Sequence, residues 1–277
     1  IMNYVETISQ LEKQLQEIGE DPENLTYVFR ELKGWSLLDF ILHRNKEVTE
    51  SDQKILESIM AQLEDHRSPQ YITGKAYFRD LELAVDERVL IPRPETEELV
   101  DLVLKENSKA DLRVLDIGTG SGAIAISLKS ARPDWQVTAS DISQGALQLA
   151  EENSKLNQVS LDFVESDVFG QITGTFDVII SNPPYIAYGD KDEVGMNVLA
   201  SEPHLALFAD EDGFAIYRQI IEGAGEHLSE NGKLYFEIGY KQGDGLRALL
   251  SKHFPQKRVR VLEDIFGKDR KVVMDNG

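Results

Sequence analysis

A glycine-rich stretch in the middle of the chain has the composition of a ligand-binding loop. The segment VLDIGTGSGAIAI, residues 114–126, carries Gly118, Gly120 and Gly122 between an apolar run that predicts a strand and one that predicts a helix. Because glycine has no Cβ, a ligand can approach the backbone closely at the start of that helix. The spacing Gly118-x-Gly120-x-x-Ala123 also satisfies the dinucleotide fingerprint, so the loop alone does not decide which ligand it takes.

Acidic residues follow the next two expected strands. Asp141 ends the strand of WQVTASD, where a carboxylate can accept both hydroxyls of a ribose. It could instead cap the following helix, a role for which Ser143 competes. Asp167 follows the strand of LDFVESD, where a carboxylate could receive an adenine amino group or simply lie in a loop. With the glycine loop, the two acids suit an adenosine-containing ligand, either NAD or S-adenosylmethionine.

The sequence NPPY, residues 182–185, ends the next apolar run. Prolines cannot continue a sheet ladder, so the buried strand of FDVIISN must end here. An amide, a rigid turn and an aromatic ring at a strand end have no role in hydride transfer. Asp116, two residues before Gly118, can orient the loop or meet a cationic ligand. Both features favour S-adenosylmethionine over NAD.

The elements around these residues alternate between strand and helix. Residues up to about 66 show helical spacing and predict a small helical bundle. From Gln70 to about Pro92 the runs YITGKAYF and LELAVDERVLI are of β type and predict a hairpin around Arg79 and Asp80. From Leu112 onward the βα alternation predicts a mostly parallel, doubly wound sheet, with the last two strands as an antiparallel hairpin. Ligands of such sheets bind at the carboxyl ends of the strands.

Composition excludes several kinds of protein. The 277 residues carry a net charge of −20, which argues against a chain that grips nucleic acid through its phosphates. There is no cysteine, so a disulfide scaffold, a thiolate metal site and a cysteine nucleophile are excluded. The five histidines show no metal-ligand spacing, and no metal is predicted. The first residues lack a secretory signal, and no apolar run approaches the ~20 residues of a membrane helix, so we expect a cytoplasmic protein.

Several motifs together carry a family resemblance. DIGTGSG with a downstream NPPY resembles class I S-adenosylmethionine-dependent methyltransferases that act on planar nitrogens. Together with YITGKAYF, IPRPETEELV, EPHLALFADEDG and FEIGYKQG, they resemble the HemK/PrmC family over nearly the whole chain. The resemblance implies a Rossmann-like, mostly parallel seven-stranded sheet, a small N-terminal helical bundle and a linking β-hairpin. It also implies S-adenosylmethionine as cofactor, S-adenosylhomocysteine as product, and methylation of a glutamine side chain in the glycine-glycine-glutamine loop of peptide-chain release factors.

The resemblance also divides the chain and assigns its site. It implies a helical substrate-recognition domain over residues 1–68, a hairpin linker over 69–92 and a methyltransferase domain over 93–277. The segment from Arg93 to Glu97 is expected to border the pocket. The family's cofactor site maps onto Gly118, Thr119, Gly120, Ser121, Gly122, Asp141, Asp167, Val168 and Asn182.

The NPPY residues suit methylation of an amide nitrogen, a poor nucleophile because its lone pair is delocalised into the carbonyl. The Asn182 side-chain oxygen and the Pro183 carbonyl can hold both N–H bonds, and Pro183 adds no competing N–H donor. Tyr185 can stack on the planar amide, and Pro184 completes the substrate-binding turn. This is catalysis by positioning and electrostatics, with Asn182, Pro183 and Tyr185 as its predicted residues.

Other functions remain open from the sequence. The same site could methylate DNA or rRNA amino groups on a flipped base, although the net charge opposes this. A non-catalytic module that senses S-adenosylmethionine and an NAD-dependent oxidoreductase are further alternatives. For partners we expect release factors, a monomer, and neither stable nucleic-acid binding nor a membrane.

Overall fold

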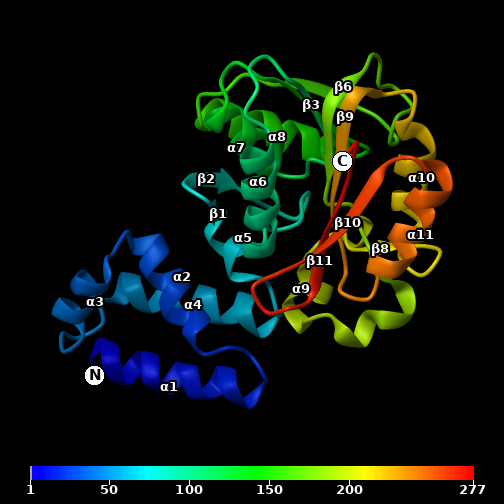
Figure 1. Cartoon of the computed structure of the whole chain (residues 1–277). Coiled ribbons are helices and arrows are strands. Elements are labelled where there is room, and N and C mark those ends of the chain that lie inside the picture. The colour runs from blue at the N-terminus through cyan, green and yellow to red at the C-terminus, as the bar shows by residue number, and fades with distance from the viewer. Residues whose placement is uncertain (1) are drawn as a thin grey trace. The chain divides into compact units, whose positions relative to one another are not determined.

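The computed structural model describes residues 2–277 and forms two compact units (Figure 1). One unit holds the described residues up to Lys75 together with Val194–Glu202. The other holds Ala76–Glu193 and Pro203–Gly277. We call them the helical unit and the sheet unit. No helix among residues 2–277 is long and apolar enough to cross a membrane.

The helical unit confirms the predicted N-terminal helices up to about residue 66. They are α1 (Tyr4–Glu17), α2 (Glu23–Lys33), α3 (Leu37–His43) and α4 (Glu50–Glu64), and a further short helix, α5 (Pro69–Thr73), follows them. Asn3, Ser36 and Thr49 accept hydrogen bonds from first-turn N–H groups of α1, α3 and α4 and so fix where these helices begin. One face of α1, α2 and α4 buries an apolar cluster that includes Leu15 and Phe29.

A segment distant in sequence completes the helical unit. Residues 194–202 lie within the range expected for the methyltransferase domain, yet they pack with the N-terminal helices through α9 (Met196–Ser201). The Asn197 side chain donates a hydrogen bond of 2.6 Å to Glu20, and the Ser68 N–H donates one of 3.1 Å to Ser201. These long-range bonds explain why local sequence patterns do not predict the position of α9.

The predicted hairpin is shorter than expected. Its strands are β1 (Lys75–Phe78) and β2 (Leu81–Ala84), and Arg79 in the turn has a positive φ of 52°. The prediction of a β run from residue 71 was wrong, because Pro69 begins helix α5 and Gly74 ends it in the left-handed region. Residues beyond Ala84 that read as strand form an irregular segment up to Arg93.

The sheet unit contains the large sheet and its covering helices. The strands are β3 (Arg113–Ile117), β4 (Gln136–Asp141), β5 (Asp162–Glu165), β6 (Phe176–Ser181), β9 (Leu228–Glu237), β10 (Arg258–Glu263) and β11 (Asp269–Asp275). The helices are α6 (Pro94–Glu106), α7 (Ala123–Ala131), α8 (Gln144–Leu156), α10 (Ala215–Ala224) and α11 (Gly243–His253). Short pieces complete it: β7 (Ile186–Ala187), β8 (Phe208–Ala209) and the 3₁₀ turns Tyr188–Glu193 and His204–Ala206.

The seven strands confirm the predicted fold class. Their order is β10-β11-β9-β6-β3-β4-β5, and only β11 runs antiparallel to its neighbours. Helix α10 ends at Ala224, and the chain turns at Gly225 and begins β9 at Leu228. A register shift between Phe176 and Val178 accommodates this early start of β9.

Apolar side chains on the two faces of the sheet form two separate cores. Val178 and Ile180 of β6 point to the face covered by α6 and α7, whereas Ile179 points to the face covered by α10 and α11. Figure 1 shows α6, α7 and α8 on one side of the sheet and α10 and α11 on the other. This period of two, with both faces buried, is what a doubly wound sheet requires.

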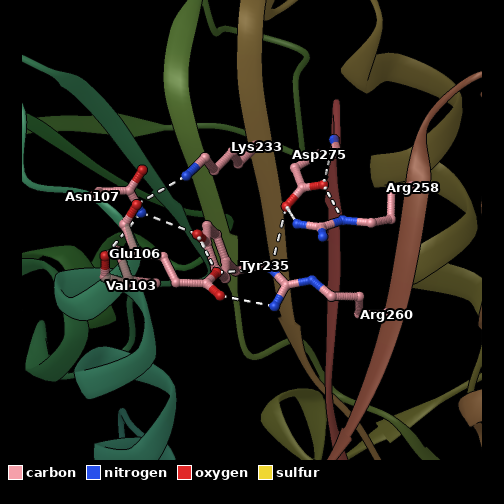
Figure 2. Close-up of polar contacts among 9 residues, drawn as sticks. Val103, Glu106, Asn107, Lys233, Tyr235, Arg258, Arg260 and Asp275 are labelled. Atoms are coloured by element: carbon pink, nitrogen blue, oxygen red, sulfur yellow. Dashed lines mark hydrogen bonds and ion pairs between the residues drawn. The ribbon is translucent and has the colours of Figure 1, made fainter.

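A polar network joins the end of α6 to the sheet (Figure 2). The Tyr235 hydroxyl accepts a hydrogen bond of 3.0 Å from Asn107 and donates one of 2.9 Å to Glu106. Arg260 donates to Glu106 at 2.8 Å and to Asp275 at 3.2 Å. The network fixes the last turn of α6 against β9, β10 and β11 at the end of α6 opposite to Thr96, which lies in its first turn.

Candidate active site

A cavity of about 410 Å³ lies at the carboxyl ends of β3, β4, β5 and β6. The predicted site residues on its wall are Gly118, Thr119, Gly120, Ser121, Asp141, Asp167, Val168, Asn182, Pro183 and Pro184. Gly122 and Tyr185 are not on its wall. Four strand ends that are distant in sequence therefore meet at one cavity, as the parallel topology requires.

The glycine loop already uses its N–H groups within the protein. Gly118 and Thr119 both donate to the Ser140 carbonyl at 2.9 Å, and Gly120 donates to Asp141 Oδ2 at 2.9 Å. These three N–H groups are therefore not free to bind a pyrophosphate, the group of a dinucleotide that lies at the start of such a helix. Gly118 and Gly120 have φ of +74° and +55°, and no atom lies within 4 Å of where a Cβ would be. The loop thus presents bare backbone to open space.

Gly122 has a different reason to be glycine. Its φ is +88°, and a Cβ there would lie 2.9 Å from Ile126 Cδ1 and 3.3 Å from Ala150 Cβ. The residue is buried between the loop, α7 and α8. The structure therefore gives Gly122 a packing role under the loop.

Asp141 connects the glycine loop to the next helix. Besides the Gly120 N–H, its carboxylate accepts the Ser143 N–H at 2.9 Å, while Ser143 caps α8. Burial raises the pKa of Asp141. A carboxylate has about four acceptor sites, so Asp141 can still accept a hydroxyl from a ligand.

Asp116 is fully buried below the loop. It accepts a hydrogen bond of 2.8 Å from the Thr119 hydroxyl, and burial raises its pKa to about 7. The sequence suggested that Asp116 either orients the loop or contacts a cationic ligand. Because Asp116 does not line the cavity, its position fits the first of these roles.

The corner after β5 is strained. Val168 has φ of +52°, which is costly for a β-branched side chain. Its carbonyl accepts a hydrogen bond of 2.7 Å from the Ser166 hydroxyl, which in turn accepts the Gln171 N–H at 2.9 Å. These bonds hold the corner so that the exposed Asp167 lies at the cavity.

Asn182 lies on the cavity wall with its amide nitrogen turned toward α6. Nδ2 donates a hydrogen bond of 3.4 Å to the Thr96 hydroxyl, and Thr96 also lines the cavity. Arg93 lines it too, so part of the PRPETE segment borders the cavity. The Tyr185 ring packs against the core on the α10 side of the sheet instead, and the Tyr185 carbonyl accepts a hydrogen bond of 2.9 Å from Gln242. Tyr185 thus anchors the turn.

Sequence reasoning missed several lining residues. The segment from Glu87 to Pro92 contributes to the wall, as do Pro203, Leu205 and Ala206 of the stretch EPHLALFADEDG. Ile142 is also on the wall and is 51% exposed. An isoleucine directly after a strand-end acid was the signal that the sequence offered for an apolar ligand face.

The residues on the wall fit an adenosylated ligand of moderate size. The cavity has the volume of a small-molecule site, a backbone cradle that a Cβ would fill, a carboxylate at one strand end and apolar side chains beside it. Among residues 2–277, no group of three or more His, Asp or Glu side chains is arranged to hold a metal ion.

Comparison with known proteins identifies the family. Over 277 residues the sequence is 54% identical to the release factor glutamine methyltransferase of Streptococcus pneumoniae strain R6, covering 100% of this chain and 99% of that protein. The chain belongs to the release factor glutamine methyltransferase family. It is also 50% identical over 271 residues to the release factor glutamine methyltransferase of Lactococcus lactis strain IL1403, covering 98% of this chain and 99% of that one.

Two domain families match separate parts of this methyltransferase. The PrmC N-terminal domain matches residues 6–74, and the methyltransferase small domain matches residues 96–208. A crystal structure of a methyltransferase from Pyrococcus furiosus superposes with a TM-score of 0.55 at 21% identity, covering 72% of this chain and 90% of that one. The family and fold predictions are confirmed, and the cofactor of this enzyme is S-adenosylmethionine.

Proposed function

We propose that this chain transfers a methyl group from S-adenosylmethionine to the side-chain amide nitrogen, N5, of the glutamine in the glycine-glycine-glutamine loop of peptide-chain release factors. Methylation there would modulate translation termination. The full-length similarity to release factor glutamine methyltransferases supports the choice of substrate. The main structural support for this chemistry is the position of Asn182. Its side chain lines the cavity, and its amide nitrogen donates a hydrogen bond to the Thr96 hydroxyl.

The orientation of Asn182 leaves its oxygen to meet the substrate. A glutamine amide has two N–H bonds and a lone pair delocalised into its carbonyl. Asn182 Oδ1 and the Pro183 carbonyl would accept those two N–H bonds and localise the lone pair on the nitrogen. S-adenosylmethionine supplies the electrophilic methyl group when bound. The protein's contribution is alignment and fixed dipoles, so it needs no strong base.

We assign cofactor contacts to the residues on the wall. Gly118 to Ser121 would meet the cofactor with bare backbone, Asp141 would accept the ribose hydroxyls, and Ile142 would pack against the adenine. Asp167 and the Val168 corner would receive the adenine amino group. The proposal makes Gly122 and Tyr185 supporting residues that position the loop and the turn.

We also propose a role for the helical unit. Residues 1–68 would recognise the release factor, 69–92 would link, and 93–277 would carry the chemistry. Leu37, Leu38 and Leu42 of α3 are exposed, and clustered exposed apolar residues are typical of protein contact sites. The net charge of −20 suits a basic protein partner better than nucleic acid, and we expect a cytoplasmic monomer that binds no membrane.

Methyl-group labelling tests this function. The protein is mixed with tritiated S-adenosylmethionine and one of three acceptors: release factor, release factor with its loop glutamine changed to alanine, or duplex DNA. Label on intact release factor alone supports the proposal. Label on DNA would keep the site chemistry and overturn the substrate, and no label on any acceptor despite cofactor binding would favour a binding module.

A further inference from the structure

A buried carboxylate stands behind Asn182. Glu237, the last residue of β9, is 2% exposed, and its Oε1 accepts a hydrogen bond of 2.6 Å from the Thr96 hydroxyl. Thr96 is itself 4% exposed. The same hydroxyl oxygen accepts the 3.4 Å hydrogen bond from Asn182 Nδ2. Three elements, β9, α6 and the turn after β6, thus form one hydrogen-bonded chain that ends at the cavity.

The direction of this chain follows from proton counting. A threonine hydroxyl has one proton, and an ionised carboxylate can only accept. Once the Thr96 proton is directed to Glu237, the hydroxyl can only accept from Asn182. It therefore selects the NH₂ end of the Asn182 amide, so Oδ1 is the end left for the substrate. With the amide reversed, Asn182 would present N–H donors to a substrate nitrogen that also carries N–H bonds.

Other charged and titratable groups also surround Glu237. Arg270 of β11 and Arg93 and Glu95 at the start of α6 act on Glu237 through their charge, and the Glu237 carboxylate in turn raises the pKa of the neighbouring Tyr185. The Tyr217 hydroxyl of α10 donates to the Glu237 backbone carbonyl at 2.7 Å. Burial raises the pKa of Glu237 to about 7, with Thr96 and Arg270 opposing that shift. A protonated Glu237 can donate to Thr96, which frees the Thr96 proton to face Asn182.

We propose that Glu237 and Thr96 are positioning residues for the methyl transfer, and that their hydrogen bond fixes which end of the Asn182 amide faces the substrate. The inference rests on the proposed function, because it concerns the amide acceptor. It adds a requirement that the NPPY turn alone does not contain: a buried acid on β9 and a hydroxyl on the first turn of α6.

A matched control exists on the same two elements. Tyr235 lies two residues before Glu237, on the same side of β9, and its hydroxyl binds Asn107 and Glu106 at the end of α6 (Figure 2). Tyr235→Phe therefore removes a buried hydroxyl from the contact between α6 and β9 without touching the chain to Asn182. A purely structural role for Thr96 predicts that Thr96→Val and Tyr235→Phe behave alike.

The experiment compares Thr96→Val, Thr96→Ser, Glu237→Gln and Tyr235→Phe with the unchanged protein. For each we would measure kcat and KM with release factor from pH 6 to 9, the dissociation constant for S-adenosylmethionine, and the melting temperature. We expect Thr96→Val to lose about 10- to 100-fold in kcat, with KM and cofactor affinity changed less than about threefold. Thr96→Ser keeps the hydroxyl and should recover most of kcat, and Tyr235→Phe should keep kcat.

The pH dependence separates positioning from packing. In the unchanged protein, kcat should rise about tenfold as the pH passes through 7, and in Glu237→Gln this rise should disappear. The inference would be overturned if kcat still rose with pH in Glu237→Gln. It would also be overturned if Thr96→Val and Tyr235→Phe had the same kcat. Should the unchanged protein fail to label release factor, the proposed function fails instead.

A readout without turnover keeps the two failures distinct. The Asn182 side-chain NH₂ resonances in a ¹⁵N–¹H spectrum should shift with a midpoint near pH 7 in the unchanged protein and lose that midpoint in Glu237→Gln. If these resonances showed no pH-dependent shift in either protein, the inference would be contradicted. This conclusion would not depend on which substrate the enzyme methylates.

Discussion

Gly120→Ala and Gly122→Ala should damage this protein in different ways, although both change a glycine of the same loop. At Gly122 an alanine would have to hold φ near +88°, with its Cβ 2.9 Å from Ile126 Cδ1 and 3.3 Å from Ala150 Cβ. The left-handed backbone costs about 1–2 kcal/mol, and overpacking adds about 1–3 kcal/mol. Reduced freedom of the unfolded chain returns about 0.4–1 kcal/mol. We expect Gly122→Ala to lose about 1–5 kcal/mol of unfolding free energy.

At Gly120 the same substitution meets open space. Its φ is +55°, and nothing lies within 4 Å of the added Cβ. Only the cost of the left-handed backbone remains, so Gly120→Ala should lose at most about 1.6 kcal/mol of unfolding free energy. Because Gly120 lines the cavity, the added methyl group would occupy space that the cofactor is proposed to fill. Cofactor affinity should therefore fall at least about tenfold.

Urea unfolding and calorimetric titration with S-adenosylmethionine measure the two effects separately. Stability loss should dominate in Gly122→Ala, and affinity loss in Gly120→Ala. If both variants lose the same stability, the packing account of Gly122 is wrong. If Gly120→Ala binds the cofactor normally, the loop does not contact the cofactor as proposed.

Three further substitutions test the structure around the site. Gly213→Ala would place a Cβ 2.1 Å from the Tyr185 carbonyl oxygen, so the NPPY turn must move; more than ~3 kcal/mol of unfolding free energy should be lost, measured by denaturant unfolding, and a normal midpoint would refute the contact. Burial raises the pKa of Asp116 to about 7. Its contribution to the unfolding free energy is therefore full below pH ~4 and falls by up to ~4 kcal/mol as the pH rises through 7. Asp116→Asn should flatten this pH dependence of the unfolding free energy between pH 5 and 8, and an unchanged pH dependence would contradict the assignment. The Arg258 guanidinium lowers the pKa of Asp275 to about 2, so the ion pair stabilises the fold above pH ~4 and this stabilisation is lost toward pH 2. Because Arg258 is half-exposed, Asp275→Asn should cost only ~1–2 kcal/mol of unfolding free energy at pH 7. Equal stability of the two proteins at pH 7 would refute the contribution of this ion pair.

Local patterns predicted the parts of the fold that local physics determines. The glycine loop, the strand-end acids and the NPPY turn each depend on a strand that ends where its apolar run ends, and parallel topology then brings them together. Helix α5 was missed because Tyr71 and Ile72 read as strand, while Pro69 and Gly74 determined the conformation.

Contacts between distant residues account for what the sequence could not predict. The attachment of α9 to the helical unit depends on a bond between Asn197 and Glu20, and no local pattern encodes that pairing. Glu237 in FEIG carried no signal of its own, since glutamate is ordinarily exposed. Its burial becomes visible only once β9 and α6 lie side by side, with Thr96 within 2.6 Å.

The most direct test of the amide-acceptor chemistry is single-turnover methylation of release factor by Asn182→Ala. The reaction is run with saturating S-adenosylmethionine, and cofactor affinity is measured in parallel. The proposed role of Asn182 Oδ1 predicts a rate lower by about 10²- to 10³-fold, the scale of removing one preorganised polar contact to the reacting group. Cofactor affinity should change only a few fold, and the melting temperature should stay close to that of the unchanged protein. A variant that methylates the glutamine at a near-normal rate would show that Asn182 does not hold the substrate amide.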